Sequence, residues 1–176
     1  MQPGDDDYLL SVRKAILSPV VPSFQSRALL MELPSLITQS RVMFFDTDAG
    51  GVVHNIAYLR FIEVNRSLLA ERLGFPLAKM LDGGECPVVV RTEIDYLRPA
   101  KLWDIIEIHG QLDSFERTRF WCSFKIVRPS DNKLLVTCRQ TLAVVKLPEM
   151  KVMRLPLHWK QDFGTGEQGS AALGSR

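Results

Sequence analysis

The helical pattern of residues 56–73 carries an unusually broad apolar surface. An amphipathic helix at a protein surface normally has a single apolar stripe, roughly 100° wide. The wider surface predicts a helix that other elements wrap. Asn55 is a suitable amino-terminal cap, and Gly74 suits the position after the last turn. Five side chains lie near one face, and three more extend it: Ile56, Leu59, Ile62, Leu69 and Leu73, then Tyr58, Phe61 and Leu68.

Four segments that follow this helix alternate apolar and polar residues with a period of two. That period is typical of a β-strand with one buried face. Together with an earlier strand at residues 40–45, the segments predict an antiparallel sheet that curls around the helix, an α+β layout. The last segment is apolar on both faces near its end, as in a central strand or one at a subunit contact. The segments cover residues 88–96, 106–112, 120–126 and 134–146.

Composition and charge narrow the class of protein. With 22 basic and 20 acidic residues, the net charge of +2 gives no electrostatic reason to expect nucleic acid or anionic membrane as the main partner. Cys86, Cys122 and Cys138 lack the spacing of a disulfide framework or a zinc site. No apolar run reaches the roughly 20 residues that a membrane-spanning helix needs. We therefore expect a cytoplasmic protein with no membrane span and no metal site.

The domain boundaries follow from changes in composition along the 176 residues. Residues 1–36 contain the break SPVVPS and are expected to form an amino-terminal extension. Residues 37–163 form the folded domain, a length suited to one hydrophobic core. Residues 164–176 are small and polar, which predicts a flexible tail.

The loop DTDAGGVVHN, residues 46–55, holds the candidate chemistry. Gly50 and Gly51 permit tight backbone geometry. A helix start exposes unpaired N–H groups that polarise a carbonyl or hold an oxyanion, and a carboxylate beside them can attack that carbonyl or activate water. Asp46 and Asp48 can equally cap turns or balance the helix dipole. Spacing alone does not decide between these roles.

Residues 41–66, RVMFFDTDAGGVVHNIAYLRFIEVNR, resemble the signature of hotdog-fold acyl-CoA thioesterases of the 4-hydroxybenzoyl-CoA thioesterase family. The resemblance is greatest to the branch associated with the bacterial Tol–Pal system. That signature is an aromatic-rich strand followed by DTDxxGxVxxxxYxxxxExxR. A looser similarity covers residues 37–159, including DYLRPAKLWD at 95–104. The resemblance implies a hotdog fold, in which an antiparallel sheet wraps a long central helix.

The same resemblance implies roles for individual residues. The catalytic carboxylate of the family falls on Asp48, which leaves Asp46 to shape the loop. The main-chain amide that polarises the thioester carbonyl maps to Asn55, where several relatives carry His. His54 stands where an aromatic residue is usual and is a secondary candidate. Tyr58 is expected either to border the acyl pocket or to pack in the core.

Arg117 and Arg119, in SFERTRF, lie close to the position at which family members place basic residues that face CoA. The phosphates of CoA favour such a patch near the mouth of the site. Both arginines would serve equally well as solvated charges at a strand edge.

The activity that the resemblance implies is hydrolysis of an acyl-CoA to a carboxylic acid and free CoA by a homodimer or homotetramer, without a cofactor. Asp48 would act as a nucleophile, through a mixed anhydride, or as a general base for water. Two alternatives stay open: a 1,4-dihydroxy-2-naphthoyl-CoA hydrolase, and a non-catalytic acyl-CoA-binding or interaction module.

Overall fold

The computed structural model describes residues 33–82 and 84–164. The chain divides into two units, Met1–Leu30 and Met31–Arg176, and all described residues belong to the second. The expected extension, except for its last four residues, and the expected tail after Gly164 lie outside the described residues. The described elements, in chain order, are β1 (Ser35–Arg41), η1 (Phe44–Asp46), α2 (Asn55–Arg72), α3 (Leu77–Leu81), β2 (Glu85–Tyr96), β3 (Ile105–Phe115), β4 (Arg119–Arg128), β5 (Lys133–Lys146), β6 (Lys151–Val152) and α4 (Trp159–Phe163).

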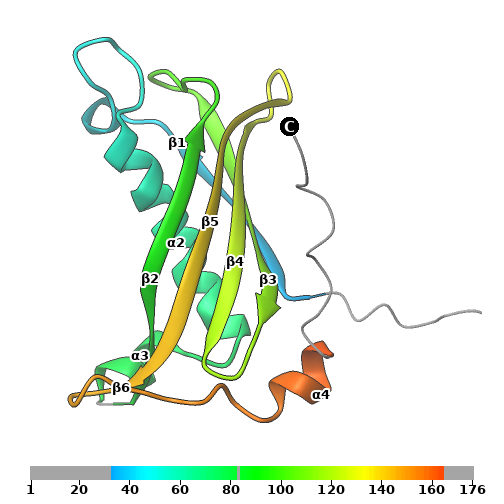
Figure 1. The fold of residues 1–176 in the computed structure, drawn as a ribbon. Coiled ribbons are helices and arrows are strands. Elements are labelled where there is room, and N and C mark those ends of the chain that lie inside the picture. Colours follow the sequence, from blue (N-terminus) through cyan, green and yellow to red (C-terminus); the bar gives the residue numbers. More distant parts are fainter. Residues whose placement is uncertain (1–32, 83, 165–176) are drawn as a thin grey trace, which may run out of the picture. The chain divides into compact units, whose positions relative to one another are not determined.

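The strands form one antiparallel sheet that curls around α2 (Figure 1). The strand order is β1-β3-β4-β5-β2, and the short β6 also pairs with β5. The α+β layout predicted from the two periodicities is confirmed. The four predicted strands after the helix are all present and are one to three residues longer at most ends. β5 lies between β4 and β2, and its residues 141–145 are buried, which confirms the prediction of a central strand.

The first strand lies earlier in the chain than predicted. β1 covers Ser35–Arg41 rather than residues 40–45, and Phe44–Asp46 forms a 3-10 turn. The carboxylate of Asp46 closes this turn by accepting the main-chain N–H of Met43 at 2.8 Å. The aromatic pair favours a strand by propensity alone, but the buried carboxylate fixes a turn and leaves both phenylalanine rings exposed.

The helix α2 is wrapped on one side only. Ile62 and Leu69 are fully buried against the sheet, as predicted, whereas Ile56 is 66% and Leu68 is 44% exposed. The expected apolar face therefore does not lie wholly in the core of one chain. β2 is equally open, because it lies at the edge of the sheet and a bulge between Val89 and Arg91 interrupts its alternation.

Asn65 is a polar group in the middle of the contact between α2 and the sheet. Its side chain is fully buried, and Nδ2 donates to Leu36 O at 3.2 Å, Thr38 Oγ1 at 3.0 Å and Ile108 O at 2.9 Å. Among the described residues, Oδ1 has no hydrogen-bond donor. It faces Gly110 of β3, where an added Cβ atom would overlap the oxygen. Only glycine fits at this position without a shift of the helix or the strand.

Replacement of Gly110 by alanine is expected to lower the free energy of unfolding by about 1–3 kcal/mol, as overpacking of a core does. The new methyl group would displace the Asn65 side chain from its three acceptors or press on the Phe124 ring, which lies 2.9 Å from the Cβ position. Urea unfolding followed by circular dichroism measures the change. Gln111→Ala, at the neighbouring exposed position, is the matched control. Equal stabilities of the two variants would contradict this account.

Candidate active site

The loop before α2 folds back on itself and brings Asp48 towards the start of the helix. The main-chain N–H of His54 donates to Asp46 O at 3.0 Å, and the N–H of Asp48 donates to Val52 O at 2.9 Å. Asp48 is two residues after Asp46, whose carbonyl closes the loop by accepting the His54 N–H. Two residues of extended chain span roughly 7 Å. The glycines that follow Asp48 allow this reversal, since Gly51 has a φ of +72°.

The two acids of the loop have different surroundings. Asp46 is 1% exposed and forms an ion pair with Arg60 of α2, besides accepting the Met43 N–H. Asp48 is exposed, and its Oδ1 accepts the Gly50 N–H at 2.8 Å. Within residues 33–82 and 84–164, Asp48 forms no ion pair. The contacts of Asp46 are those of a residue that shapes the loop, whereas Asp48 keeps one carboxylate oxygen free.

The start of α2 offers a free main-chain donor. Asn55 was predicted to cap the helix, but it is the first helical residue, and His54 occupies the cap position without a side-chain hydrogen bond to the helix. His54 is held extended by the bond from its N–H to Asp46 O, and the helix starts one residue earlier than predicted. Among the described residues, the Asn55 N–H has no acceptor. It therefore presents a donor at the positive end of the helix dipole.

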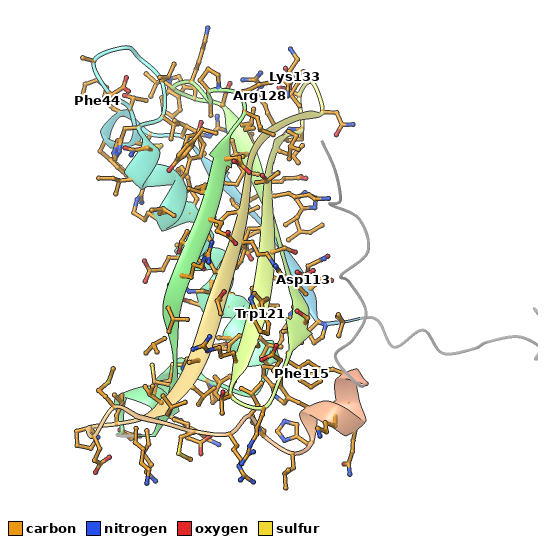
Figure 2. The ribbon with its side chains drawn as sticks, viewed as in Figure 1. Phe44, Asp113, Phe115, Trp121, Arg128 and Lys133 are labelled. Atoms are coloured by element: carbon orange, nitrogen blue, oxygen red, sulfur yellow. The ribbon has the colours of Figure 1, made fainter. Side chains whose placement is uncertain are left out.

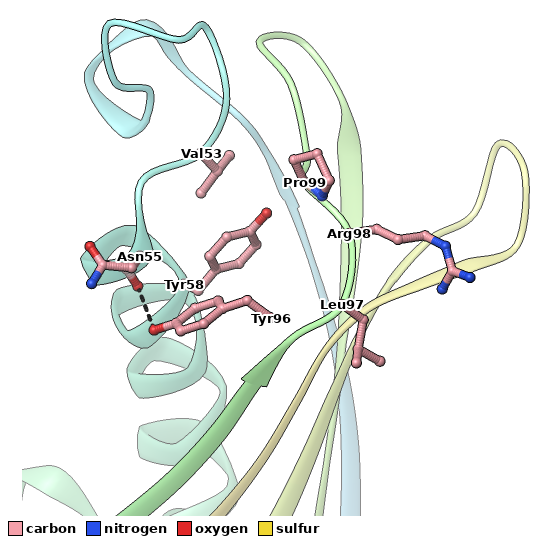
Figure 3. A pocket seen from close by; sticks show the side chains of 7 residues that line it. All are labelled: Val53, Asn55, Tyr58, Tyr96, Leu97, Arg98 and Pro99. Carbon is pink, nitrogen blue, oxygen red and sulfur yellow. Dashed lines mark hydrogen bonds between the residues drawn. The ribbon is translucent and has the colours of Figure 1, made fainter.

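An open pocket of about 250 Å³ lies beside this helix start (Figure 3). One wall comes from the loop and the first turn of α2, and the other comes from the end of β2 and the chain after it. Asp48 and His54 do not line it. The residues that line it are Val53, Asn55, Tyr58, Tyr96, Leu97, Arg98 and Pro99.

Two tyrosines form the aromatic side of the pocket. The Tyr58 ring is buried and lies 5.8 Å from the Tyr96 ring, centroid to centroid. Tyr58 Oη accepts the Ala100 N–H at 2.8 Å, and burial raises the pKa of Tyr58, so the phenol stays protonated at neutral pH. Tyr96 Oη donates to Asn55 O at 3.3 Å. Tyr58 therefore packs in the core and also borders this pocket, and its contact with an acyl group stays a prediction.

Hydrogen bonds to β5 fix the wall that follows β2. The N–H groups of Leu97 and Arg98 both donate to Leu135 O, at 2.8 and 3.0 Å. The Arg98 guanidinium donates to Leu134 O at 3.1 Å, and Figure 3 shows it directed away from the tyrosines. This side of the pocket is thus held by main-chain contacts rather than by a free loop.

Arg117 and Arg119 do not lie at this site within the chain. Arg117 lies in the turn that joins β3 to β4 and Arg119 is the first residue of β4, whereas the candidate site lies beside the other ends of these strands. Figure 2 shows Phe115 at the end of the sheet opposite to Phe44 and Arg128. Eleven residues of β3 separate the two ends, roughly 35 Å of extended chain. The loose similarity in sequence carried no information on which end of the hairpin faces the helix start.

Sequence reasoning missed Tyr96, Leu97 and Pro99 as pocket residues. The motif DYLRPAKLWD at residues 95–104 was the available signal, because it follows the end of a predicted strand. It also missed Arg60, whose partner Asp46 lies fourteen residues earlier in the chain. No spacing rule links these two residues before the loop is folded.

Neither buried cysteine fits a nucleophile. Burial raises the pKa of the Cys122 thiol to about 12 and that of Cys138 to about 11. Both thiols are therefore protonated at neutral pH and inaccessible to a substrate. No group of three or more His, Cys, Asp or Glu side chains suited to a metal ion occurs in the part of the chain that the structure describes.

The sequence profile of the thioesterase-like superfamily matches residues 42–163. The chain belongs to this superfamily. It is 31% identical to the acyl-CoA thioesterase YbgC of Haemophilus influenzae over 124 residues, which are 70% of this chain and 90% of that protein. It is also 31% identical over 106 residues to the 1,4-dihydroxy-2-naphthoyl-CoA hydrolase of Synechococcus elongatus, which are 59% of this chain and 76% of that protein.

Solved structures of thioesterases share the fold of this member of the thioesterase-like superfamily. The crystal structure of a probable thioesterase from Bartonella henselae is 32% identical, covers 69% of this chain and 99% of that one, and superposes with a TM-score of 0.62. The hotdog fold expected from the resemblance is confirmed. Membership of the Tol–Pal-associated branch stays a prediction. Among the described helices, none is long and apolar enough to cross a membrane.

Proposed function

We propose that the protein is an acyl-CoA thioesterase, which hydrolyses an acyl-CoA to a carboxylic acid and free CoA. The observation that carries this proposal is the exposed Asp48 carboxylate, held on a loop that pairs with the chain just before the free N–H of Asn55. Membership of the thioesterase-like superfamily and the similarity to YbgC support the same reaction. The reaction consumes one water, and no cofactor takes part, since CoA is part of the substrate.

In the proposed reaction the thioester carbonyl oxygen accepts the Asn55 N–H. This donor stabilises the negative charge that develops on the oxygen when the acyl carbon is attacked, a contribution typically of about 10²–10³ in kcat. Asp48 either attacks the acyl carbon, giving a mixed anhydride that water opens, or removes a proton from the attacking water. On both routes the C–S bond breaks, the acyl carbon gains oxygen from water, and the sulfur leaves to become the thiol of CoA.

A panel of acyl-CoAs with aliphatic and aromatic acyl groups tests the proposal, with released thiol as the readout. Hydrolysis of several members at rates above the buffer blank is the expected result. Binding of the panel without turnover would favour the acyl-CoA-binding module instead.

His54, at the cap position of α2, is a secondary candidate for a contact with substrate, and His54→Ala in the same assay measures its contribution.

The second candidate function is hydrolysis of 1,4-dihydroxy-2-naphthoyl-CoA. The similarity to the hydrolase of Synechococcus elongatus favours it. Direct comparison of this substrate with benzoyl-CoA and aliphatic acyl-CoAs separates the two candidates. Preference for the naphthoyl thioester by at least about tenfold in kcat/KM would correspond to the discrimination that one or two pocket contacts supply.

We further propose that two or four copies of the chain associate, with contact through β2. This strand is at the edge of the sheet, and Val90 is 53% exposed on it. Ile56 and Leu68 leave α2 equally open. An exposed, apolar edge strand pairs readily with another strand, and natural proteins usually cover such edges. A second copy is also required if Arg117 and Arg119 are to reach the phosphates of CoA at this site.

Light scattering on the purified full chain is expected to give a dimer or tetramer. Val90→Glu should shift the mass towards that of one chain, because a carboxylate would be buried at the contact without a partner. Gln39→Glu, at an exposed position of the opposite edge strand β1, is the matched control and should leave the mass unchanged. A wild-type protein that is monomeric at micromolar concentration would contradict the proposal.

The proposed location is the cytoplasm. The three cysteines are free thiols, which fits a reducing compartment.

A further inference from the structure

We propose that Arg128 is a positioning residue for the loop that carries Asp48, and that it acts through Asp104. This inference rests on the proposed thioesterase function and names a side chain outside the site on which its rate depends. We define the Asp48 loop as residues 43–52. Arg128 is the last residue of β4, and its guanidinium donates to Asp104 and Asp131, neither of which belongs to the loop.

The Asp48 loop is anchored at its start by the segment 100–104. The N–H of Val42, the residue directly before the loop, donates to Asp104 O at 2.9 Å, and the N–H of Trp103 donates to Val42 O at 3.0 Å. Val42 is fully buried, and hydrogen bonds are electrostatically stronger in such a low-dielectric environment than in water. The first end of the loop therefore follows the position of this segment.

The same segment anchors the other end of the loop. The N–H of Val53 donates to Ala100 O at 2.9 Å, and Val52 forms an antiparallel bridge with Lys101. Ala100 is itself buried, and its N–H donates to Tyr58 Oη at 2.8 Å. Both ends of the Asp48 loop are thus hydrogen-bonded to one short segment, whose conformation sets the distance between them.

The segment 100–104 ends in a tight turn that depends on the Asp104 carboxylate. Asp104 Oδ2 accepts the Lys101 N–H at 2.9 Å, and the Asp104 N–H donates to Lys101 O at 3.0 Å. Between them, Trp103 has a φ of +71°, a conformation that residues other than glycine rarely adopt. Such a conformation persists only where the surrounding structure enforces it. The carboxylate therefore keeps the turn in the shape to which both ends of the loop are bonded.

Arg128 holds that carboxylate in place. Its Nη1 donates at 2.8 Å to Asp104 Oδ2, the oxygen that also accepts the Lys101 N–H. The same guanidinium binds both oxygens of Asp131, Nε to Oδ1 at 3.0 Å and Nη2 to Oδ2 at 2.8 Å, which fixes its direction. The Arg128 and Asp104 side chains are 17% and 23% exposed, so salt screens the pair weakly. Arg128 thus ties the turn to the β4–β5 hairpin, at the end of the sheet where Figure 2 also shows Phe44 of the loop.

The position of Asp48 depends on these anchors because its own hydrogen bonds are local. Among the described residues, they join it to Gly50, Gly51 and Val52, all within the Asp48 loop. A movement of the loop ends therefore carries the carboxylate with it. A displacement of about 1 Å at a reacting group can cost about 100-fold in rate. We expect kcat to fall more than KM rises, since Asp48 acts in the chemical step rather than in holding CoA.

The turnover test compares thiol release by wild type, Arg128→Gln and Arg128→Lys over the acyl-CoA panel. Arg128→Gln is expected to lower kcat at least about tenfold and to change KM less than about threefold. Arg128→Lys keeps a charge for Asp104 and should recover at least about threefold of the lost kcat. Arg139→Gln is the matched control, because Arg139 pairs with Asp113 at 3.1 Å without a contact to the segment 100–104, and both constants should stay unchanged.

A double variant separates positioning from a general loss of structure. Arg128→Gln is combined with Asp48→Asn, and kcat is compared with that of Asp48→Asn alone. An effect that passes through the Asp48 carboxylate disappears once the carboxylate is absent, so less than about twofold further loss is expected. An equal loss of kcat in both backgrounds would overturn the proposal. If Arg128→Gln folds poorly, Asp104→Asn replaces it, since the amide oxygen still accepts the Lys101 N–H while the ion pair is lost.

Hydrogen exchange on the full chain separates failure of this inference from failure of the proposed function, because it requires no turnover. Arg128→Gln is expected to raise exchange in residues 42–53 at least about tenfold, as local opening does, and to leave residues 106–112 of β3 unchanged. Faster exchange without hydrolysis of any acyl-CoA by wild type would reject the proposed function and still support the hold of Arg128 on the loop. Unchanged exchange in a folded Arg128→Gln overturns the inference, and so does a wild-type kcat in that variant.

Discussion

Replacement of Asp48 by asparagine is expected to lower kcat for acyl-CoA hydrolysis by at least about 100-fold, because an amide neither attacks the acyl carbon nor takes a proton from water. The fold should be unaffected. Asp48 is exposed, and the amide oxygen of asparagine can still accept the Gly50 N–H. Single-turnover and steady-state thiol release, with the melting temperature measured on the same samples, provide the comparison.

Asp46→Asn is the matched control for Asp48→Asn. It removes the charge of a buried carboxylate that pairs with Arg60 and closes the turn at Met43. The expected result is the reverse pattern, a lower melting temperature with a smaller loss of kcat per folded molecule. Full activity of Asp48→Asn would refute the assignment of Asp48 as the catalytic carboxylate.

Replacement of Asn55 by proline is expected to lower kcat by about 10²–10³, the usual result of removing one oxyanion donor. Proline deletes the main-chain N–H, which donates to no described residue, and also replaces the asparagine side chain. The first position of a helix tolerates proline well, and the preceding residue must be extended. His54 already is, with φ −72° and ψ 153°. The change therefore tests the donor without breaking α2.

Asn55→Ala is the complementary variant, since it removes the side chain and keeps the N–H. We expect its kcat to stay within about threefold of wild type, because the proposed donor is in the main chain. Circular dichroism of both variants checks that α2 is intact. Equal activities of Asn55→Pro and wild type would show that the Asn55 N–H does not stabilise the transition state.

Most of the fold could be predicted from the sequence because its signals are local. Alternation along β3, β4 and β5 and the apolar surface of α2 are properties of short windows. The first strand was predicted too late in the chain because the aromatic pair Phe44 and Phe45 is typical of a strand. The turn that forms there instead depends on the buried Asp46 carboxylate. The position of β2 was predicted, but the exposure of both its faces was not. The bulge and the edge position depend on how all the strands pair, which a short window of sequence does not show.

Only the part of the candidate site that is continuous in sequence could be predicted. The residues of the loop and first helical turn lie together in sequence and therefore in space. Tyr96 approaches Asn55 only because β2 ends beside the helix start, a long-range relation of forty-one positions. Arg117 and Arg119 show the opposite case, since a basic pair in a plausible motif lies at the far end of the hairpin.

The buried amide of Asn65 has a consequence for how the chain selects one alignment of its first strand. β1 is short and half polar, so its own side chains discriminate weakly between alternative pairings with β3. In the native pairing, Thr38 lies opposite Ile108, and the Asn65 amide contacts both residues. A shift of one residue would turn Thr38 to the other face and remove its hydroxyl from the buried Asn65 amide. The buried amide thus destabilises misaligned pairings of β1 with β3 more than it stabilises the native pairing.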